Sequence, residues 1–97
     1  MRYTIRVELE DAVFKDYRKL HAAMMNHNFC QYITDDDGAI YKLPMDEYNF
    51  EGDVSKVEVL HNVRKAVLSA GLRASVLVTE ASGRTWFGLE EIISSAA

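Results

Sequence analysis

The hydrophobic pattern changes period along the chain, and the order of these periods restricts the fold more than any motif does. Residues 3–9 alternate apolar and polar side chains, as expected for a strand with one buried face. Residues 13–24 then follow a helical period, and strand-like runs occupy 29–34 and 39–43. A second helical stretch covers 55–70, before alternation returns in the last strand. This order predicts a ferredoxin-like βαββαβ fold of the α+β class, with an antiparallel sheet and two helices on one face.

Local signals predict where these elements begin and end. Asp11 is expected to cap the first helix, and Ser55 with Glu58 matches the S-x-x-E capping box of the second. Asp37-Gly38 predicts a tight turn between the two middle strands, and Gly71 is typical of a helix end. The expected core stripes are Val13, Tyr17, Leu20 and Met24 in the first helix and Leu60, Val63 and Val67 in the second.

Two further segments extend this pattern. Tyr48 and Phe50 alternate with polar residues, which indicates that strand structure resumes after Pro44. Residues 84–89 form an aromatic tail, for which we expect either a short extra C-terminal strand or packing against a partner.

Size and composition limit the class of protein. Ninety-seven residues, 48% of them hydrophobic, predict one globular domain spanning residues 1–97. Two helices on one sheet leave the other sheet face uncovered, so we expect a homodimer. The net charge of −4 argues against a strongly basic nucleic-acid binder but allows a local basic patch.

The cysteine count and the lack of a long apolar run indicate the cellular compartment. Cys30 is the single cysteine, which excludes an internal disulfide and suits a reducing environment. The first residues enter a strand with no apolar leader, and no apolar run approaches the roughly 20 residues that span a bilayer. We therefore expect a cytoplasmic protein without membrane contact.

No motif for a metal, a cofactor or a nucleophile is recognisable. The acidic turn before Gly38 fails the calcium-loop pattern, because Pro44 stands where the last glutamate is required. The three histidines lack zinc-ligand spacing, so we predict no metal site and no cofactor. Glu8, Glu10 and Asp11 leave one alternative open, a Mg²⁺ held by carboxylates, against the simpler role of Asp11 as a helix cap.

One group of side chains suits phosphate contacts. Arg2 and Arg6 lie on the polar side of the first strand, and Arg73 lies at the start of the last. These strands are neighbours in the expected fold, so the guanidinium groups would share the face opposite the helices. The alternative is an ordinary solvated face, or a dimer seam that uses Leu77.

Several segments also resemble a known family. They are Tyr3–Leu9, the helix with Asp16-Tyr17 and Leu20-His21, Tyr41–Tyr48, Val76–Glu80 and Arg84–Leu89. Together they resemble the GhoS-type family of phage- and plasmid-borne proteins, the endoribonuclease antitoxins of type V toxin–antitoxin systems.

The resemblance implies a ferredoxin-like domain that cleaves the messenger RNA of a toxin. The acidic residue late in the family's first strand falls on Glu8, and a basic residue of its first helix falls near His21, with Lys19 beside it. On this hypothesis Glu8 and His21 are catalytic, and RNA contacts the arginine-bearing face and Lys19.

A second hypothesis comes from a different class of function. Here the chain is a non-catalytic phage or plasmid accessory protein that binds a second copy, a host protein or a toxin-system partner. Leu77 on the open face, with Trp86 and Phe87 in the tail, would form the interface, since aromatic side chains often dominate binding energy. Whether the chain is an enzyme therefore stays open at this point.

Overall fold

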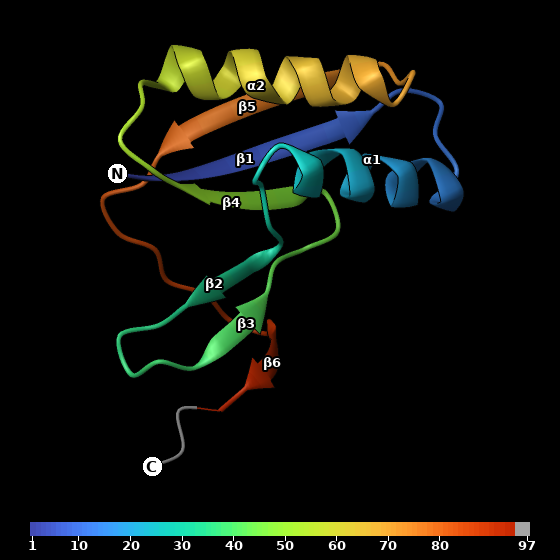
Figure 1. Cartoon of the computed structure of the whole chain (residues 1–97). Coiled ribbons are helices and arrows are strands. Elements are labelled where there is room, and N and C mark those ends of the chain that lie inside the picture. Colours follow the sequence, from blue (N-terminus) through green and yellow to red (C-terminus); the bar gives the residue numbers. More distant parts are fainter. Residues whose placement is uncertain (95–97) are drawn as a thin grey trace.

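The computed structural model describes residues 1–94, which form a helix-covered sheet joined to a second, smaller sheet (Figure 1). Both sheets are antiparallel, with strand orders β4-β1-β5 and β2-β3-β6. The elements are β1 (Arg2–Leu9), α1 (Phe14–Asn26), β2 (Tyr32–Thr34), β3 (Ile40–Lys42), β4 (Glu47–Glu51), α2 (Lys56–Ser69), β5 (Ala74–Glu80) and β6 (Glu90–Ile93).

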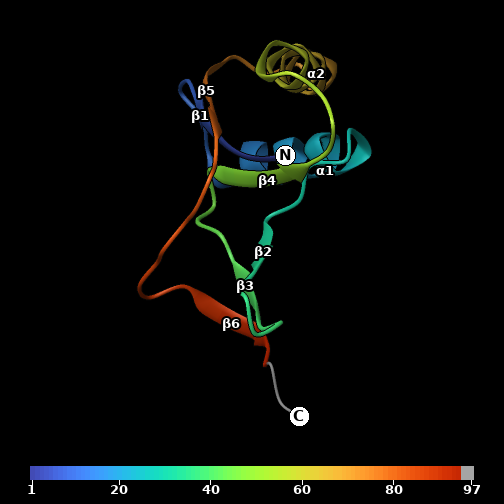
Figure 2. The same cartoon turned by 90° about the vertical axis from the view of Figure 1, so that its left-hand side faces the viewer.

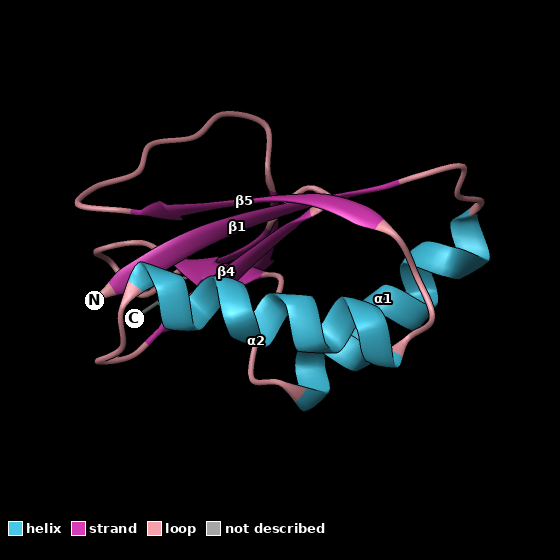
Figure 3. Cartoon of the chain, turned by 90° about the horizontal axis from the view of Figure 1, so that it is seen from above, coloured by secondary structure: helices cyan, strands magenta, loops and turns pink. Residues whose placement is uncertain are grey.

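Strand β1 is the centre of the larger sheet, and its alternation separates the two faces of that sheet. Ile5 lies opposite Tyr48 of β4 and Val78 of β5, which confirms that the first and last predicted strands are neighbours. Tyr3, Ile5 and Val7 are fully buried. Both helices cover this apolar face, and no helix covers the reverse face (Figures 2 and 3). On the reverse face, Arg84 of the C-terminal tail packs on Thr4 and Asn49. The predicted placement of both helices on one face is therefore confirmed.

The core lies between this face of β1 and the two helices. It contains Tyr48 and Phe29 as its other large aromatic side chains. The first helix contributes Leu20, Ala23 and Met24, and the second contributes Val59, Val63, Ala66 and Val67. Burial of such apolar area is the main favourable free energy of the fold.

The helix ends match the sequence signals in one case and not in the other. Ser55 caps α2 as predicted, its hydroxyl accepting from the Glu58 N–H at 3.2 Å. Asp11 does not cap α1, because it adopts a left-handed conformation with φ of 47°. Instead the helix begins after Val13, whose N–H donates to the Asp16 carboxylate at 3.0 Å.

Two residues expected in the core stripes are exposed. Val13 precedes the first helical turn and Leu60 lies at the margin of α2, and both side chains face solvent. The remaining members of both stripes are buried or packed against the core. The helical period was therefore correct, and the errors lie at the edges of each stripe.

The prediction of a single four-stranded sheet is wrong. The hairpin of β2 and β3 joins β6 in a separate sheet, and the backbone pairing of residues 29–34 with the main sheet is limited to a bridge between Cys30 and Asn49. The strand beside β1 is β4, the segment in which strand structure resumes after Pro44. The Gln31 side-chain amide donates to the carbonyls of Pro44, Met45 and Glu47, which holds the chain in the bend that separates the sheets.

The turn of the small sheet has the predicted form. Asp35 Oδ1 accepts from the N–H groups of Asp37 and Ala39, both at 2.9 Å. Gly38 has a φ of +88°, a conformation that is strained for other residues.

The C-terminal tail packs across both sheets before it forms a strand. Trp86 contacts Tyr41 with ring centroids 5.3 Å apart, and Arg84 donates to side-chain oxygens of Thr4 and Asn49. Residues 84–89 do not form the extra strand expected there; the strand β6 follows this aromatic segment and pairs with β3. Within residues 1–94, no helix has the length and apolar character needed to cross a membrane.

Replacing Tyr3 with Phe tests the polar anchor of the core. The buried Tyr3 hydroxyl donates to the Val54 carbonyl, so Y3F leaves that acceptor without its partner. We expect the free energy of unfolding in urea to fall by about 1–2 kcal/mol. The same change at exposed Tyr32 is the control and should leave stability nearly unchanged.

Candidate functional site

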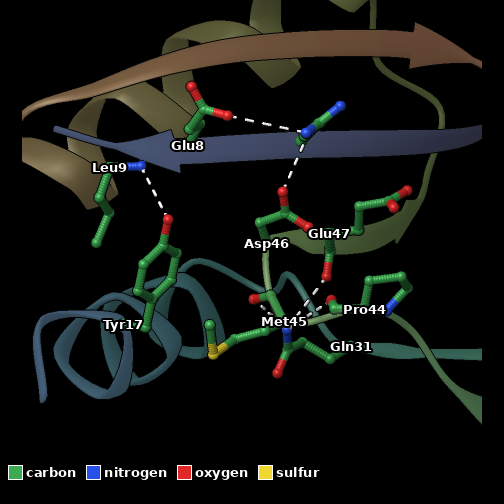
Figure 4. Close-up of polar contacts among 9 residues, drawn as sticks. Glu8, Leu9, Tyr17, Gln31, Pro44, Met45, Asp46 and Glu47 are labelled. Atoms are coloured by element: carbon green, nitrogen blue, oxygen red, sulfur yellow. Dashed lines mark hydrogen bonds and ion pairs between the residues drawn. The ribbon is translucent and has the colours of Figure 1, made fainter. Parts of the chain in front are cut away.

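The open face of the main sheet carries a cluster of charged side chains, Arg6, Glu8 and Asp46. Figure 4 labels Glu8 and Asp46 of this cluster. The alternation of β1 points Arg6 and Glu8 away from the core, and Asp46 lies in the turn before β4. Arg6 Nε donates to Asp46 Oδ2 at 3.1 Å, and Arg6 Nη2 lies 3.8 Å from Glu8 Oε2. One guanidinium therefore lies between two carboxylates.

This cluster is fixed to the sheet but open to solvent. The Val7 N–H donates to the Asp46 carbonyl at 2.8 Å, which holds the turn against β1. The Glu8 side chain is 67% exposed, and Leu77 beside it is 63% exposed. Exposed ion pairs contribute about 0–1 kcal/mol, so the Arg6 guanidinium can exchange Glu8 for another anion at little cost. Asp46, whose side chain is 25% exposed, is the closer and less exposed partner.

The other cations expected to bind nucleic acid are spread over the molecule. Arg2 lies on the same side of β1 as Arg6, four residues earlier in the strand. Arg73 precedes β5 and forms an ion pair with Glu10, with Nε 3.5 Å from the carboxylate. Lys19 is an exposed residue of α1, in the helical layer on the other side of the sheet. Arg2 and Arg6 therefore share a face of β1 without being in contact, and Lys19 lies on the other side of the sheet.

His21 occupies a different environment, between α1 and β4. Its Nδ1 is hydrogen-bonded to the Tyr48 hydroxyl, and the two ring centroids lie 5.7 Å apart. Burial, followed by the nearby Lys42 charge, lowers the pKa of His21 below its usual value. Burial also raises the pKa of Tyr48, so its hydroxyl keeps its proton and forms this hydrogen bond with a neutral imidazole.

His21 faces a small cavity at the junction of the helical layer and the small sheet. The cavity has a volume of about 120 Å³, and Cys30, Lys42 and Tyr48 are among its lining residues. Glu8 lies on the open face of the main sheet, whereas His21 lies on the helix-covered side. The structure therefore does not bring the two predicted catalytic residues together.

The carboxylates near the end of β1 do not gather as metal ligands. Glu10 pairs with Arg73 and Glu8 with Arg6, while Asp11 is in the left-handed region. In the part of the chain from 1 to 94, no group of three histidine, cysteine or carboxylate side chains is placed to hold a metal ion.

The sequence pattern did not identify the contacts of two charged residues, Asp46 and Arg84. Asp46 contacts Arg6 across 40 positions, and this contact depends on the β1–β4 register, which no local pattern reveals. Arg84 contacts Thr4 and Asn49 of the main sheet. Its position beside aromatic residues suggested a partner interface and gave no sign of this intramolecular contact.

The lowered pKa of His21 predicts a pH-dependent stability. Between this pKa and 6.5, the usual value, the unfolded chain binds more protons than the folded one. The contribution of neutral His21 is therefore complete above pH 6.5 and is lost as the pH falls through the lowered pKa. We expect urea denaturation at a series of pH values to show this loss in the wild type and less of it in H21Q. The control H61Q changes an exposed histidine and should keep the wild-type slope.

Comparison with known proteins identifies the family. The model of a family described as endoribonuclease GhoS matches residues 1–81 of the 97-residue chain. This range includes the Arg6, Glu8 and Asp46 cluster as well as His21, and it ends before Arg84. No match was found among curated proteins. Because the matched range covers both helices and all three strands of the main sheet, the chain belongs to the GhoS endoribonuclease family.

Proposed function

We propose that this protein is an antitoxin-type endoribonuclease that holds RNA on the open face of its main sheet. The observation that carries the proposal is the position of Arg6 and Glu8, side by side on an accessible face, within the range matched by an endoribonuclease family. A guanidinium binds phosphate oxygens, and a neighbouring carboxylate accepts a proton from a hydroxyl group. These are the two functions that RNA cleavage without a metal requires.

In the proposed reaction, Glu8 removes the proton from a ribose 2′-hydroxyl, whose oxygen then forms a bond to the adjacent phosphorus. The bond from phosphorus to the 5′ oxygen breaks, and that oxygen takes a proton from water. The hydroxide left behind takes the proton from Glu8, which restores the carboxylate. The products carry a 2′,3′-cyclic phosphate and a 5′-hydroxyl. Arg6 keeps its Nε hydrogen bond to Asp46, donates from its Nη groups to the phosphate, and stabilises the negative charge that develops on its oxygens.

His21 and Lys19 lie outside the proposed Glu8 site. Both lie on α1, on the side of the sheet away from Glu8, so they do not act on the same phosphate as Glu8 does. The alternative site for acid–base chemistry is the His21 cavity, where Lys42 would supply the positive charge. The Tyr48 hydrogen bond and the burial of the imidazole favour a structural role for His21 over this alternative.

The proposed setting follows from the family. The protein would act in the cytoplasm as one component of a phage- or plasmid-borne toxin–antitoxin pair, with the toxin messenger RNA as its substrate. Arg2 and Arg73 would extend the contact with the RNA backbone beyond the Arg6 cluster.

The first test of this proposal is the variant E8Q. It keeps the shape of the side chain and removes the base, so we expect cleavage of an end-labelled random-sequence RNA pool to slow by at least about 100-fold. The matched control E90Q changes an exposed glutamate of β6 and should cleave at the wild-type rate. DNA of the same sequences lacks the 2′-hydroxyl and should not be cleaved.

The variant H21A separates the two candidate sites in the same assay. Cleavage by H21A at the wild-type rate, at a pH and temperature where the variant is folded, supports the Glu8 site. Loss of cleavage in H21A together with full activity in E8Q would move the chemistry to the His21 cavity.

A binding function is the second candidate, and exposed apolar side chains favour it. Phe87 is 99% exposed and Leu77 is 63% exposed, and β5, which carries Leu77, is an edge strand of its sheet. Trp86 differs from these two, because it is half-buried against Tyr41. A homodimer through the open face would bury Leu77 together with its symmetry copy.

Sedimentation velocity at high protein concentration tests the homodimer. On this second candidate function, the wild type is a dimer whose seam covers Arg6 and Glu8, and L77D shifts to monomer because a charge at the centre of the seam cannot be solvated there. The control L68D changes an equally exposed leucine of α2, outside this face, and should leave the dimer intact. A wild-type monomer would rule out this seam.

A further inference from the structure

A polar cleft lies between the C-terminal tail and the two sheets, away from the Arg6 cluster. Its volume is about 300 Å³, near the lower limit of pockets that hold small organic ligands. Arg2 comes from the start of β1, and Arg84 and Trp86 come from the tail. Asp35 and Asp36 come from the turn of the small sheet. Three separate parts of the chain thus converge on one cleft.

Arg84 brings a positive charge that has no anionic partner. Its Nη1 donates to Asn49 Oδ1 at 2.8 Å and to Thr4 Oγ1 at 3.3 Å, and both acceptors are neutral. Among residues 1–94, neither Arg84 nor Arg2 forms an ion pair, and Arg84 Nε is buried without a hydrogen-bond partner. Burial, and then the charge of Arg2, lowers the pKa of Arg84. The nearby Glu51, which lies opposite Arg2 on β4, raises this pKa and offsets part of that effect. Both guanidinium groups line the cleft, so an anion bound there could accept hydrogen bonds from both, including the unpartnered Arg84 Nε.

The other lining groups select the kind of anion. Asp35 uses Oδ1 to hold its own turn, and Asp36 is exposed at the cleft. Carboxylates repel a bare inorganic anion but accept hydrogen bonds from hydroxyl groups. Trp86 adds an aromatic ring that Tyr41 holds in place. A ligand that carries a phosphate, hydroxyl groups and a planar ring meets all three requirements.

We propose that this cleft binds one nucleotide, with its phosphate on Arg2 and Arg84, its ribose hydroxyls toward Asp36, and its base against Trp86. The choice of a nucleotide over other phosphate esters rests on the proposed RNA function. Arg84 and Trp86 lie beyond the residues matched by the family model, so the cleft is a feature of this chain and not of that match. The nucleotide is either one residue of a bound RNA or a free mononucleotide.

Trp86 offers a direct readout, since it is the single tryptophan of the chain. We expect adenosine 5′-monophosphate to shift the indole N–H resonance of Trp86 in a ¹H–¹⁵N spectrum, in a saturable manner. Adenosine, which lacks the phosphate, should bind at least about tenfold more weakly. A short oligoribonucleotide that saturates at lower concentration than the mononucleotide identifies RNA as the source, and the reverse order identifies the free nucleotide. No saturable shift with either ligand overturns the proposal.

Variants assign the shift to the cleft. Removing the charge in R2A should weaken binding of adenosine 5′-monophosphate by about tenfold. R84K keeps a positive charge but removes the planar N–H donors of the Arg84 guanidinium, so it tests whether those donors bind the phosphate. The matched control R18A removes an exposed arginine of α1 and should bind as the wild type does. Since R84K also alters contacts to the sheet, R2A decides if R84K does not fold. Wild-type affinity in R2A overturns the assignment.

The same samples separate this inference from the proposed function. E8Q should lose RNA cleavage and keep nucleotide binding at the cleft, because Glu8 does not line it. Nucleotide binding in a wild-type protein that cleaves no RNA would support the nucleotide cleft and overturn the nuclease proposal. RNA cleavage without any shift of the Trp86 resonance would support the nuclease proposal and overturn nucleotide binding at the cleft.

Discussion

The alternation of side chains along β1 is the constraint on which the other features of this protein depend. One side of the strand carries Tyr3, Ile5 and Val7, which are fully buried beneath the two helices. The other side carries Arg6 and Glu8, which remain in solvent because no helix covers that face. A shift of the β1 register by one residue would exchange these two sets, burying charges and exposing the core. The fold and the charged surface are therefore set by the same eight residues.

The sequence predicted the local elements well because their causes are local. Helical and strand periods reflect which side chains meet the core, and the Ser55 cap and the Asp35–Gly38 turn each depend on a few neighbouring residues. The strand order was wrong because it depends on a choice between two candidate strands for the place beside β1. Residues 39–43 and 47–51 both alternate, and the bend held by Gln31 decides between them.

The candidate site was predicted in part for the same reason. The shared direction of Arg2 and Arg6 follows from alternation alone, and the separation of Glu8 from His21 follows once the helices are placed on one face. Asp46 and Arg84 could not be found this way, because their contacts join positions 40 and 80 residues apart. Side chains whose role depends on long-range pairing leave no periodic trace in the sequence.

The attachment of the small sheet has a mechanical consequence. It is joined to the main sheet by the Cys30–Asn49 bridge, by the Gln31 amide and by the Arg84 guanidinium, all of them polar contacts. The principal hydrophobic core lies elsewhere, under the helices. Phe29, just before β2, adds one apolar contact at this junction. We expect the contacts between the two sheets to open at a lower free energy than the main core does. Any molecule that binds to both sheets at once would therefore oppose their separation.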